Sequence, residues 1–209
     1  MRVCTVLRSG GEYKPGHVQR LAAQVAKFLP GADFFALSDV EVPGVQIVPM
    51  EFNYPHWWAK MELMDPRIAG DLLYFDLDTT IVGDLSDLAA IGTWAPCADF
   101  YRPHLLQTSM AFFSDAGRRE TWFNWLSRTP PAVMKAWRGD GEFVHAVWKH
   151  RCRPVQDLLP GQVVSYKIHV QLDPRKRNHV GNGFIPTNTR VICYHGNPRP
   201  WQVAEPRFQ

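Results

Sequence analysis

One short segment constrains the fold of this chain more than any other. Residues 72–75, Leu-Leu-Tyr-Phe, form a continuous apolar run that leads directly into Asp76-Leu77-Asp78. An apolar run without polar alternation is typical of a strand that is covered on both faces, as in a parallel sheet. The segment therefore predicts a buried strand that delivers two carboxylates to its carboxyl end.

The rest of the chain alternates between strand and helix patterns. Alternation through the first 90 residues predicts an α/β sheet, and ligands of such sheets bind at the carboxyl ends of the strands. The acidic pair lies at such an end. We expect strands at residues 3–7, 32–37, 45–48, 72–75, 98–101, 109–113, 163–166 and 191–194, and helices at 15–29, 57–64, 116–127 and 140–149.

Composition narrows the class of protein. The 209 residues include 23 Lys and Arg against 20 Asp and Glu, a formal net charge of +3, which is too small an excess for a dedicated nucleic-acid binder. No stretch approaches the roughly 20 apolar residues of a membrane-spanning helix. We expect one globular domain over residues 1–209, with no transmembrane segment and no nucleic-acid partner.

The cysteines predict neither a disulfide framework nor a zinc site, because they are widely scattered and none forms a C-x-x-C pair. The N-terminus fits a first strand and shows no signal-peptide pattern. Both features favour a cytoplasmic protein with reduced thiols. The four cysteines are Cys4, Cys97, Cys152 and Cys193.

Asp76 and Asp78 are the strongest candidates for chemistry. In an extended chain, residues i and i+2 lie about 6.6 Å apart on one side, so both carboxylates point the same way while Leu77 faces the core. Two such carboxylates suit a hard cation, Mg²⁺ or Mn²⁺, that also binds a substrate phosphate. An isolated Asp-x-Asp more often caps a turn beside a solvated carboxylate, but its position at the sheet edge favours a metal site.

A second group of polar residues follows the late strand at 191–194. His195 supplies an imidazole, Gly196 admits a phosphate close to the backbone, and Arg199 offers a two-pronged contact to phosphate oxygens. A lone histidine after a strand is otherwise a structural residue. An imidazole beside two carboxylates would favour Mn²⁺ over Mg²⁺.

Four segments in this order closely resemble bacterial glycosyltransferases of the GT-A fold, whose well-known relatives are glycogenin and the lipopolysaccharide galactosyltransferases. The segments are residues 6–13 (VLRSGGEY), 57–63 (WWAKMEL), 74–85 (YFDLDTTIVGDL) and 195–201 (HGNPRPW). The resemblance spans nearly the whole chain. It implies an α/β fold, a single Rossmann-like GT-A domain that binds a nucleotide-diphospho-sugar on a central, mostly parallel mixed sheet.

The resemblance also implies the reaction and its residues. The expected reaction is transfer from a UDP-sugar donor to a glycan, lipid or protein acceptor, with a divalent cation, usually Mn²⁺, and with retention of the anomeric configuration. The implied metal ligands are Asp76, Asp78 and His195. The implied donor-binding residues are Arg8, Ser9, Gly10, Tyr13, Lys60, Asp76, Gly196 and Arg199.

Two segments depart from the family pattern. Relatives often show Asn-Ser-Gly or Asn-Ser-Ser where residues 107–109 are Gln-Thr-Ser, and an Asp-Gln pair where residues 139–142 are Gly-Asp-Gly-Glu. These segments would face the donor sugar and the acceptor. Asp140 and Glu142 are therefore candidate catalytic acids, although carboxylates in a first helical turn need no function. Lys167 is a further candidate for phosphate or acceptor contact.

Two other functions stay open. Residues 76–80 match the Asp-x-Asp-x-Thr motif of haloacid dehalogenase-like phosphatases, but those enzymes carry it on their first strand, and Val144 stands where residues 139–144 would need an acid. The eight tryptophans suit an inactive sugar-nucleotide or glycan-binding module, although most fit the core. Residues 175–179 are basic, and we expect them to be a solvated part of a mobile loop at 173–183. Nucleic-acid binding through so short a basic run is the weaker interpretation.

Overall fold

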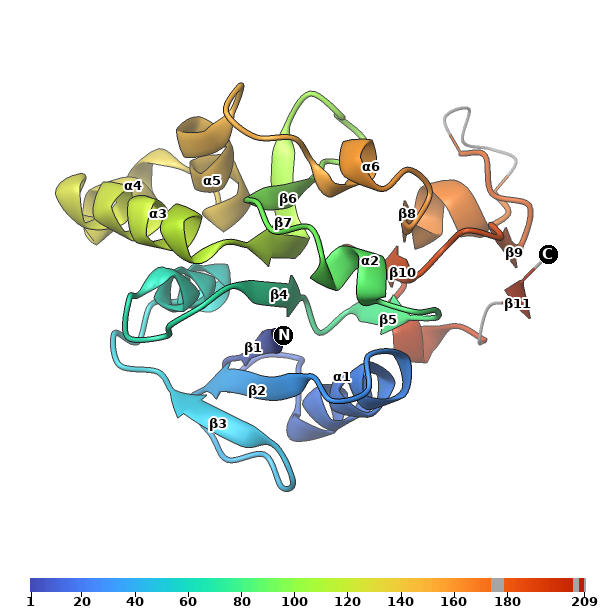
Figure 1. Ribbon diagram of the computed structural model, residues 1–209, viewed down its shortest axis with the longest axis horizontal. Helices are drawn as coiled ribbons and strands as arrows, with labels where there is room; N and C mark the ends of the chain where they lie inside the picture. The colour runs from blue at the N-terminus through green and yellow to red at the C-terminus, as the bar shows by residue number, and fades with distance from the viewer. Residues whose placement is uncertain (174–178, 205–206, 209) are drawn as a thin grey trace.

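A central six-stranded sheet runs through the computed structural model, which describes residues 1–173, 179–204 and 207–208 (Figure 1). β3, β2, β1 and β4 are parallel, and β7 runs antiparallel to both of its neighbours. The sheet is therefore mixed and mostly parallel, as predicted. In spatial order its strands are β3 (Gln46–Pro49), β2 (Asp33–Ser38), β1 (Arg2–Leu7), β4 (Leu72–Phe75), β7 (Leu106–Phe113) and β6 (Ala95–Ala98).

Burial on both faces explains why the sequence of β4 is apolar throughout. Leu73 and Phe75 face one buried cluster, whereas Leu72 and Tyr74 face another on the opposite side of the sheet. Alternate side chains of a strand point to opposite faces, so a strand with two buried faces has no position for a polar residue. The prediction of a doubly covered strand is confirmed.

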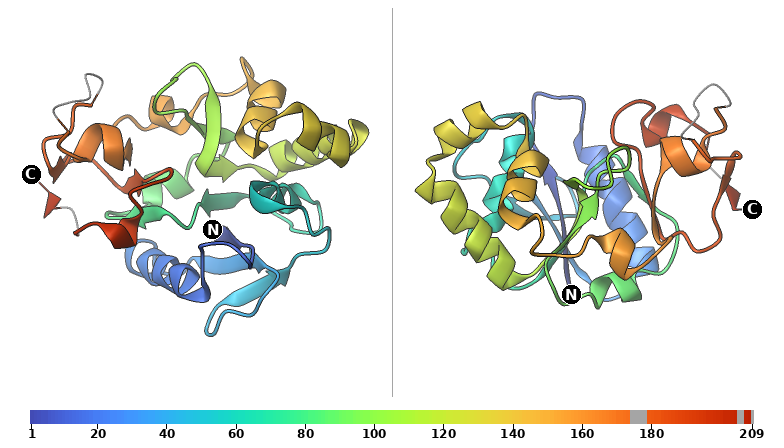
Figure 2. Two further views of the ribbon diagram at one scale, coloured as in Figure 1. Left: turned by 180° about the vertical axis from the view of Figure 1, so that it is seen from behind. Right: turned by 90° about the horizontal axis from the view of Figure 1, so that it is seen from above.

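Helices cover both faces of the sheet, as Figure 2 shows in the view from above. On one face lie α1 (Pro15–Phe28), α2 (Ser86–Ala89) and α6 (Val155–Leu158). On the other lie the 3-10 helix η1 (His56–Met64), α3 (Asp115–Ser127), α4 (Pro130–Ala136) and α5 (Asp140–Trp148). The molecule is thus layered as helices, sheet and helices, the α/β arrangement that the sequence predicted.

Helix α1 follows local signals in the sequence. Pro15 stands at its first turn, where the missing N–H costs nothing and the fixed φ suits a helix. Val18, Leu21 and Val25 recur at helical spacing and are fully buried against the sheet. After the helix, Gly31 adopts a φ of 80°, a left-handed conformation that turns the chain back towards β2.

Two smaller sheets lie beside the central one. β10 (Val191–Cys193) pairs antiparallel with β5 (Thr79–Ile81) and parallel with β8 (Val163–Ser165). β9 (Phe184–Ile185) pairs in parallel with β11 (Arg207–Phe208). The π-helical turn η2 (Tyr166–Val170) follows β8, and the 3-10 turn η3 (Pro200–Gln202) follows β10. The pairing of β10 with β5 brings the segment after β10 next to the acidic turn.

Two local expectations were wrong. The strand expected at 98–101 ends at Ala98, because the Asp99 side chain accepts the N–H groups of Tyr101 and Arg102 and closes a turn there. Asp76 and Asp78 lie on a turn instead of an extended strand, because the Thr79 N–H bonds the Asp76 carbonyl at 3.1 Å.

Part of the predicted basic loop lies outside the residues that the structure describes. Of the expected mobile loop at 173–183, residues 174–178 lie outside the described residues, and so does most of the basic segment 175–179.

Across the part of the chain that the structure describes, no helix combines the length and the apolar character needed to cross a membrane.

Candidate active site

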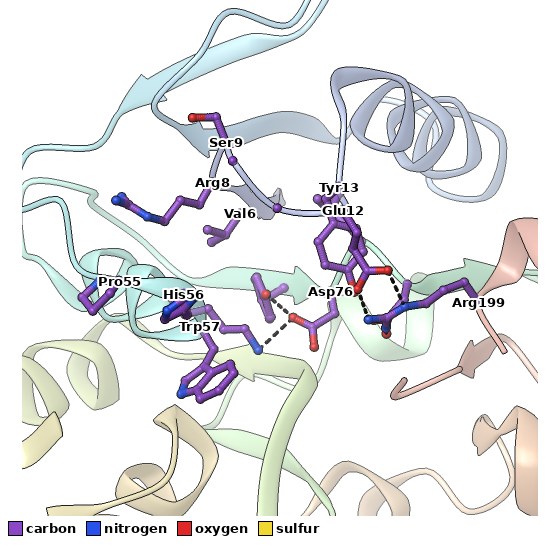
Figure 3. A pocket seen from close by; sticks show the side chains of 16 residues that line it. Val6, Arg8, Ser9, Glu12, Tyr13, Pro55, His56, Trp57, Asp76 and Arg199 are labelled. Atoms are coloured by element: carbon purple, nitrogen blue, oxygen red, sulfur yellow. Dashed lines mark hydrogen bonds and ion pairs between the residues drawn. The ribbon is translucent and has the colours of Figure 1, made fainter. Parts of the chain in front are cut away.

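A pocket of about 700 Å³ lies where β1 and β4 end (Figure 3). This is the carboxyl edge of the parallel strands, the usual ligand position of an open α/β sheet. The loop after β1, the helix η1, the acidic turn and the segment after β10 all contribute to it. The predicted donor-binding residues that line it are Arg8, Ser9, Gly10, Tyr13, Lys60, Asp76 and Arg199.

Asp76 is held by side chains from the body of the fold. Lys60 Nζ lies 2.8 Å from Asp76 Oδ1, and the Tyr74 hydroxyl donates a hydrogen bond to the same oxygen (Figure 3). Burial raises the pKa of Asp76 to about 6; the Lys60 charge opposes this shift and the Asp78 charge adds to it. Asp76 therefore keeps a proton to a higher pH than an ordinary aspartate.

Lys60 also connects Asp76 to Asp140, the first residue of α5. Its Nζ lies 3.4 Å from Asp140 Oδ2 and 3.4 Å from Thr108 Oγ1, and the Thr108 hydroxyl donates a hydrogen bond to Asp140. Burial disfavours the Lys60 ammonium, but the charges of Asp140 and Asp76 outweigh it and raise the Lys60 pKa above its usual value. A charged lysine thus bridges two carboxylates at the inner end of the site.

Asp78 is held from the other direction, by the segment after β10. Arg199 forms an ion pair with Asp78 Oδ2, and the Gly196 N–H lies 3.3 Å from the same oxygen. Arg199 also pairs with Glu12 and lies over the Tyr13 ring, with 5.2 Å between the guanidinium carbon and the ring centroid. Gly196 has a φ of 100°, in the left-handed region that glycine adopts without strain, which permits its close backbone approach.

His195 is adjacent to this cluster in sequence, but its ring is engaged elsewhere. Its Nε2 lies 2.6 Å from Ser165 Oγ, and the ring stacks on Phe100 with centroids 5.3 Å apart. Burial and the nearby Lys167 charge lower the pKa of His195 to about 4, so the imidazole is neutral near pH 7. Lys167 Nζ donates to the His195 carbonyl at 3.0 Å and supports the same backbone.

The predicted metal ligands are only partly assembled. Among the described residues, no group of three or more His, Cys, Asp or Glu side chains is placed to hold a metal ion. The His195 ring bonds Ser165, and Arg199 pairs with one oxygen of Asp78. The hydrogen bonds from Tyr74, Gly196 and Arg199 fall on Asp76 Oδ1 and Asp78 Oδ2, so the other oxygen of each carboxylate still suits a hard cation. His195 as the third ligand stays a prediction.

The loop after β1 runs along the pocket from Arg8 and Ser9 to Glu12 and Tyr13, which contact Arg199. Gly10 allows its tight turn with a φ of 87°. Ser9 donates to Asp39 through both its N–H, at 2.8 Å, and its hydroxyl, at 2.6 Å. Asp39 was not predicted as a site residue, although an acid directly after β2, the strand parallel and adjacent to β1, is a signal that could have identified it.

Two further candidates differ in their relation to the pocket. Glu142 does not line the pocket. Its carboxylate instead accepts hydrogen bonds from the backbone N–H and the Nε–H of Arg138, at 2.9 and 2.6 Å. Trp57 lines the pocket and is 52% exposed, whereas the neighbouring Trp58 is buried. The Trp57 indole packs against Gly139, where a Cβ would lie only 3.1 Å from Trp57 Nε1.

Comparison with known proteins identifies the fold. No family model and no curated protein matches the sequence. The galactosyltransferase LgtC, solved with donor and acceptor sugar analogues, aligns over 96% of this chain and 89% of its own, with a TM-score of 0.62 and 14% identity. An active-site mutant of LgtC aligns with a TM-score of 0.65. The chain has the GT-A fold.

A second GT-A match differs in length. The glycosyltransferase GlyE of Streptococcus pneumoniae aligns over 98% of this chain with a TM-score of 0.66 and 12% identity, and this chain spans 57% of GlyE. The fold that the four sequence segments predicted is confirmed. Asp140 and Gly196 lie outside the lining of the pocket and contact the lining residues Lys60 and Asp78. The predicted residues that line the pocket are Arg8, Ser9, Gly10, Tyr13, Lys60, Asp76, Asp78 and Arg199.

Proposed function

We propose that this chain is a glycosyltransferase that moves a sugar from a UDP-sugar donor to an acceptor, with a divalent metal ion and retention of configuration. One observation carries the proposal: two carboxylates on one turn and two cationic side chains, Lys60 and Arg199, line a single cavity at the carboxyl edge of the strands. A diphosphate that binds together with a cation needs both kinds of group. The likeness to LgtC and GlyE supports this interpretation.

The acidic turn would hold the metal ion through Asp76 and Asp78, with His195 as a further ligand and Mn²⁺ favoured over Mg²⁺. A bound cation would stabilise the negative charge that grows on the departing diphosphate. Arg199 and Lys60 would bind phosphate oxygens, and Arg199 would exchange Asp78 and Glu12 for them. The Gly196 N–H, which donates to Asp78 Oδ2 in this structure, would donate to a phosphate oxygen.

The remaining pocket residues would place the nucleoside and the sugar. Arg8, Ser9, Gly10 and Tyr13, which line the pocket, would bind the nucleoside. At the inner end, Asp140 is the candidate catalytic carboxylate, because it is buried beside Lys60 and Thr108.

Two further catalytic candidates have weaker positions. Lys167 would hold the backbone of the His195 segment, the role that its hydrogen bond to the His195 carbonyl indicates. Glu142 would stabilise the start of α5 with Arg138 and take no part in the reaction.

Titration calorimetry with UDP, with and without Mn²⁺, tests the proposal directly. We expect binding that depends on Mn²⁺ in the wild type and falls at least about tenfold in Asp78→Ala, because one carboxylate ligand and the Arg199 partner are lost together. Asp33→Asn is the matched control, since Asp33 is an exposed acid paired with Arg2 at the opposite end of the sheet. Absence of UDP binding in both conditions would contradict the proposal.

Activity assays separate the transferase from the two alternatives. A panel of UDP-sugars, followed for slow donor hydrolysis and for transfer to glycan, lipid and protein acceptors, should single out one sugar. UDP binding without hydrolysis or transfer would indicate an inactive binding module. Vanadate-sensitive release of phosphate from small esters would indicate a phosphatase, although the acidic turn here follows β4 and not the first strand of the chain.

A further inference from the structure

A side chain of α1 holds the backbone of the acidic turn. Arg20 is half-buried on this helix, and its Nη2 donates to the Leu77 carbonyl at 2.8 Å and to the Thr79 carbonyl at 2.9 Å. Its Nη1 lies 3.4 Å from the hydroxyl oxygen of Thr80. One guanidinium therefore binds the chain on both sides of Asp78.

The four backbone carbonyls of the acidic turn, residues 76–79, all have partners. The Asp76 carbonyl accepts the Thr79 N–H at 3.1 Å, and the Asp78 carbonyl accepts the Tyr194 N–H at 3.2 Å. Arg20 binds the other two carbonyls. A buried carbonyl without a partner is costly, so such groups are almost always paired. Two of the four carbonyls of the turn thus depend on a single side chain.

The side chain between the two carboxylates is anchored as well. Leu77 is buried in the apolar cluster that also holds Leu21 and Val25 of α1. Its side chain and its carbonyl are both fixed, so the residue cannot rotate without losing apolar contacts and a hydrogen bond together. The neighbouring Asp76 and Asp78 are left to line the pocket.

We propose that Arg20 is a positioning residue for the metal ion, which holds the backbone of the acidic turn so that Asp76 and Asp78 present their carboxylates to one cation. The inference rests on the proposed function, because it assumes that these carboxylates bind the metal ion. Loss of a group that orients metal ligands without touching the metal typically lowers metal affinity by about 10- to 100-fold.

The charge of Arg20 makes this role testable, because charge and position act in opposite directions. Burial lowers the pKa of Arg20 and the Asp78 charge works against this shift, so the two charges interact, and the guanidinium stays ionised. A positive charge near the carboxylates repels a metal cation, so its removal alone would raise the affinity for that cation. Loss of the two carbonyl contacts would lower the affinity. The sign of the change separates the two roles.

Electron paramagnetic resonance of free Mn²⁺, without nucleotide, measures the affinity in each variant. In Arg20→Met we expect a fall of at least about tenfold. Arg20→Gln also lacks the charge and is too short to reach both carbonyls, so it should show the same fall if Arg20→Met does not fold. Arg20→Lys should recover most of the affinity, because both carbonyls bind one nitrogen, Nη2, whose place an ammonium can take.

Gln24→Met is the matched control. Gln24 also lies on α1 and also bonds β5, but its Oε1 accepts the Ile81 N–H, at 3.1 Å, beyond the acidic turn. Its Mn²⁺ affinity should stay at the wild-type value. Hydrogen exchange of residues 76–80, measured without metal, should be faster in Arg20→Met than in the wild type or in Gln24→Met. Thermal unfolding verifies that each variant is folded.

The outcomes distinguish this inference from the proposed function. A higher Mn²⁺ affinity in Arg20→Met would show that Arg20 acts through its charge, and equal losses in Arg20→Met and Gln24→Met would show only a general support of β5 by α1. Either result would overturn the positioning role and leave the transferase proposal intact. Absence of Mn²⁺ binding to the wild type, with and without UDP, would overturn the proposed metal dependence and this inference together.

Discussion

The two carboxylates of the acidic turn are two residues apart, yet the structure holds them in different ways. Asp76 is bound by Lys60 from η1 and Tyr74 from β4, both elements of the packed body of the fold. Asp78 is bound by Arg199 and the backbone of Gly196, which follow it by more than 100 residues. We call these the inner ion pair, Lys60 with Asp76, and the outer ion pair, Arg199 with Asp78.

The two pairs differ in their support more than in their burial. The side chains are 16% and 24% exposed in the inner pair and 14% and 6% in the outer pair. However, η1 buries most of its side chains, including Trp58, whereas η3 has no buried residue. An ion pair is only as fixed as the elements that carry it. The inner pair is therefore preorganised, and the outer pair is suited to exchanging partners when a ligand binds.

Replacing Lys60 should have the largest effect, because it breaks the inner pair inside the packed fold. In Lys60→Met, Asp76 and Asp140 would face each other without a cation, and we expect the free energy of unfolding to fall by about 3 kcal/mol at pH 7. Urea unfolding followed by far-UV circular dichroism, without nucleotide, measures the change.

The matched variant Arg199→Met breaks the outer pair. Because η3 can separate from the acidic turn and leave Asp78 in water, we expect a loss of no more than about 1 kcal/mol. Faster hydrogen exchange should be confined to residues 194–202. Equal losses of stability in the two variants would refute the distinction between the pairs.

The inner pair also predicts a pH dependence of metal binding. Asp76 has a pKa raised to about 6, so below pH 6 it keeps a proton that Mn²⁺ must displace. The affinity for Mn²⁺ should therefore fall as the pH falls, by about tenfold between pH 7 and pH 5. Electron paramagnetic resonance of free Mn²⁺ measures this without nucleotide, whose own phosphate would titrate in the same range.

His195 provides the control for this measurement. Its pKa is lowered to about 4 by burial and by the Lys167 charge, so the imidazole is neutral throughout pH 5–7 and adds no slope. His195→Ala should keep the same pH dependence at whatever affinity remains. An affinity that is flat from pH 5 to pH 7 in the wild type would show that Asp76 does not bind the ion.

The sequence predicted the surroundings of the inner ion pair better than those of the outer ion pair. β1, α1 and β4 have long or uninterrupted hydrophobic patterns, and parallel strand order alone brings their ends to one edge. The position of Asp76 at the sheet edge follows from these patterns, whereas Arg8 and Lys60 were predicted through the resemblance of their segments to GT-A glycosyltransferases. The short helices α2, α4 and α6 were missed, because four to seven residues give no readable period.

The surroundings of the outer ion pair depend on tertiary contacts that no local sequence pattern encodes. His195 has a φ of 39°, an uncommon left-handed conformation for a residue with a side chain, and its ring lies on Ser165 and Phe100 instead of in the acidic cluster. Glu12 was missed for a similar reason, because its partner Arg199 lies 187 residues away in sequence. Ion pairs between loops are set by the finished fold.

The smallest predicted effect concerns Glu12, which competes with a donor phosphate for Arg199. In Glu12→Gln the competing charge is gone, so the affinity for UDP in Mn²⁺ should rise about two- to threefold. The gain is small because the Glu12 side chain is 49% exposed and solvent screens its pair with Arg199. Glu120→Gln is the matched control, since Glu120, on α3, forms a comparable pair with Arg151. A lower affinity in Glu12→Gln would mean that Glu12 positions Arg199 for the donor, and the outer ion pair would then be as preorganised as the inner one.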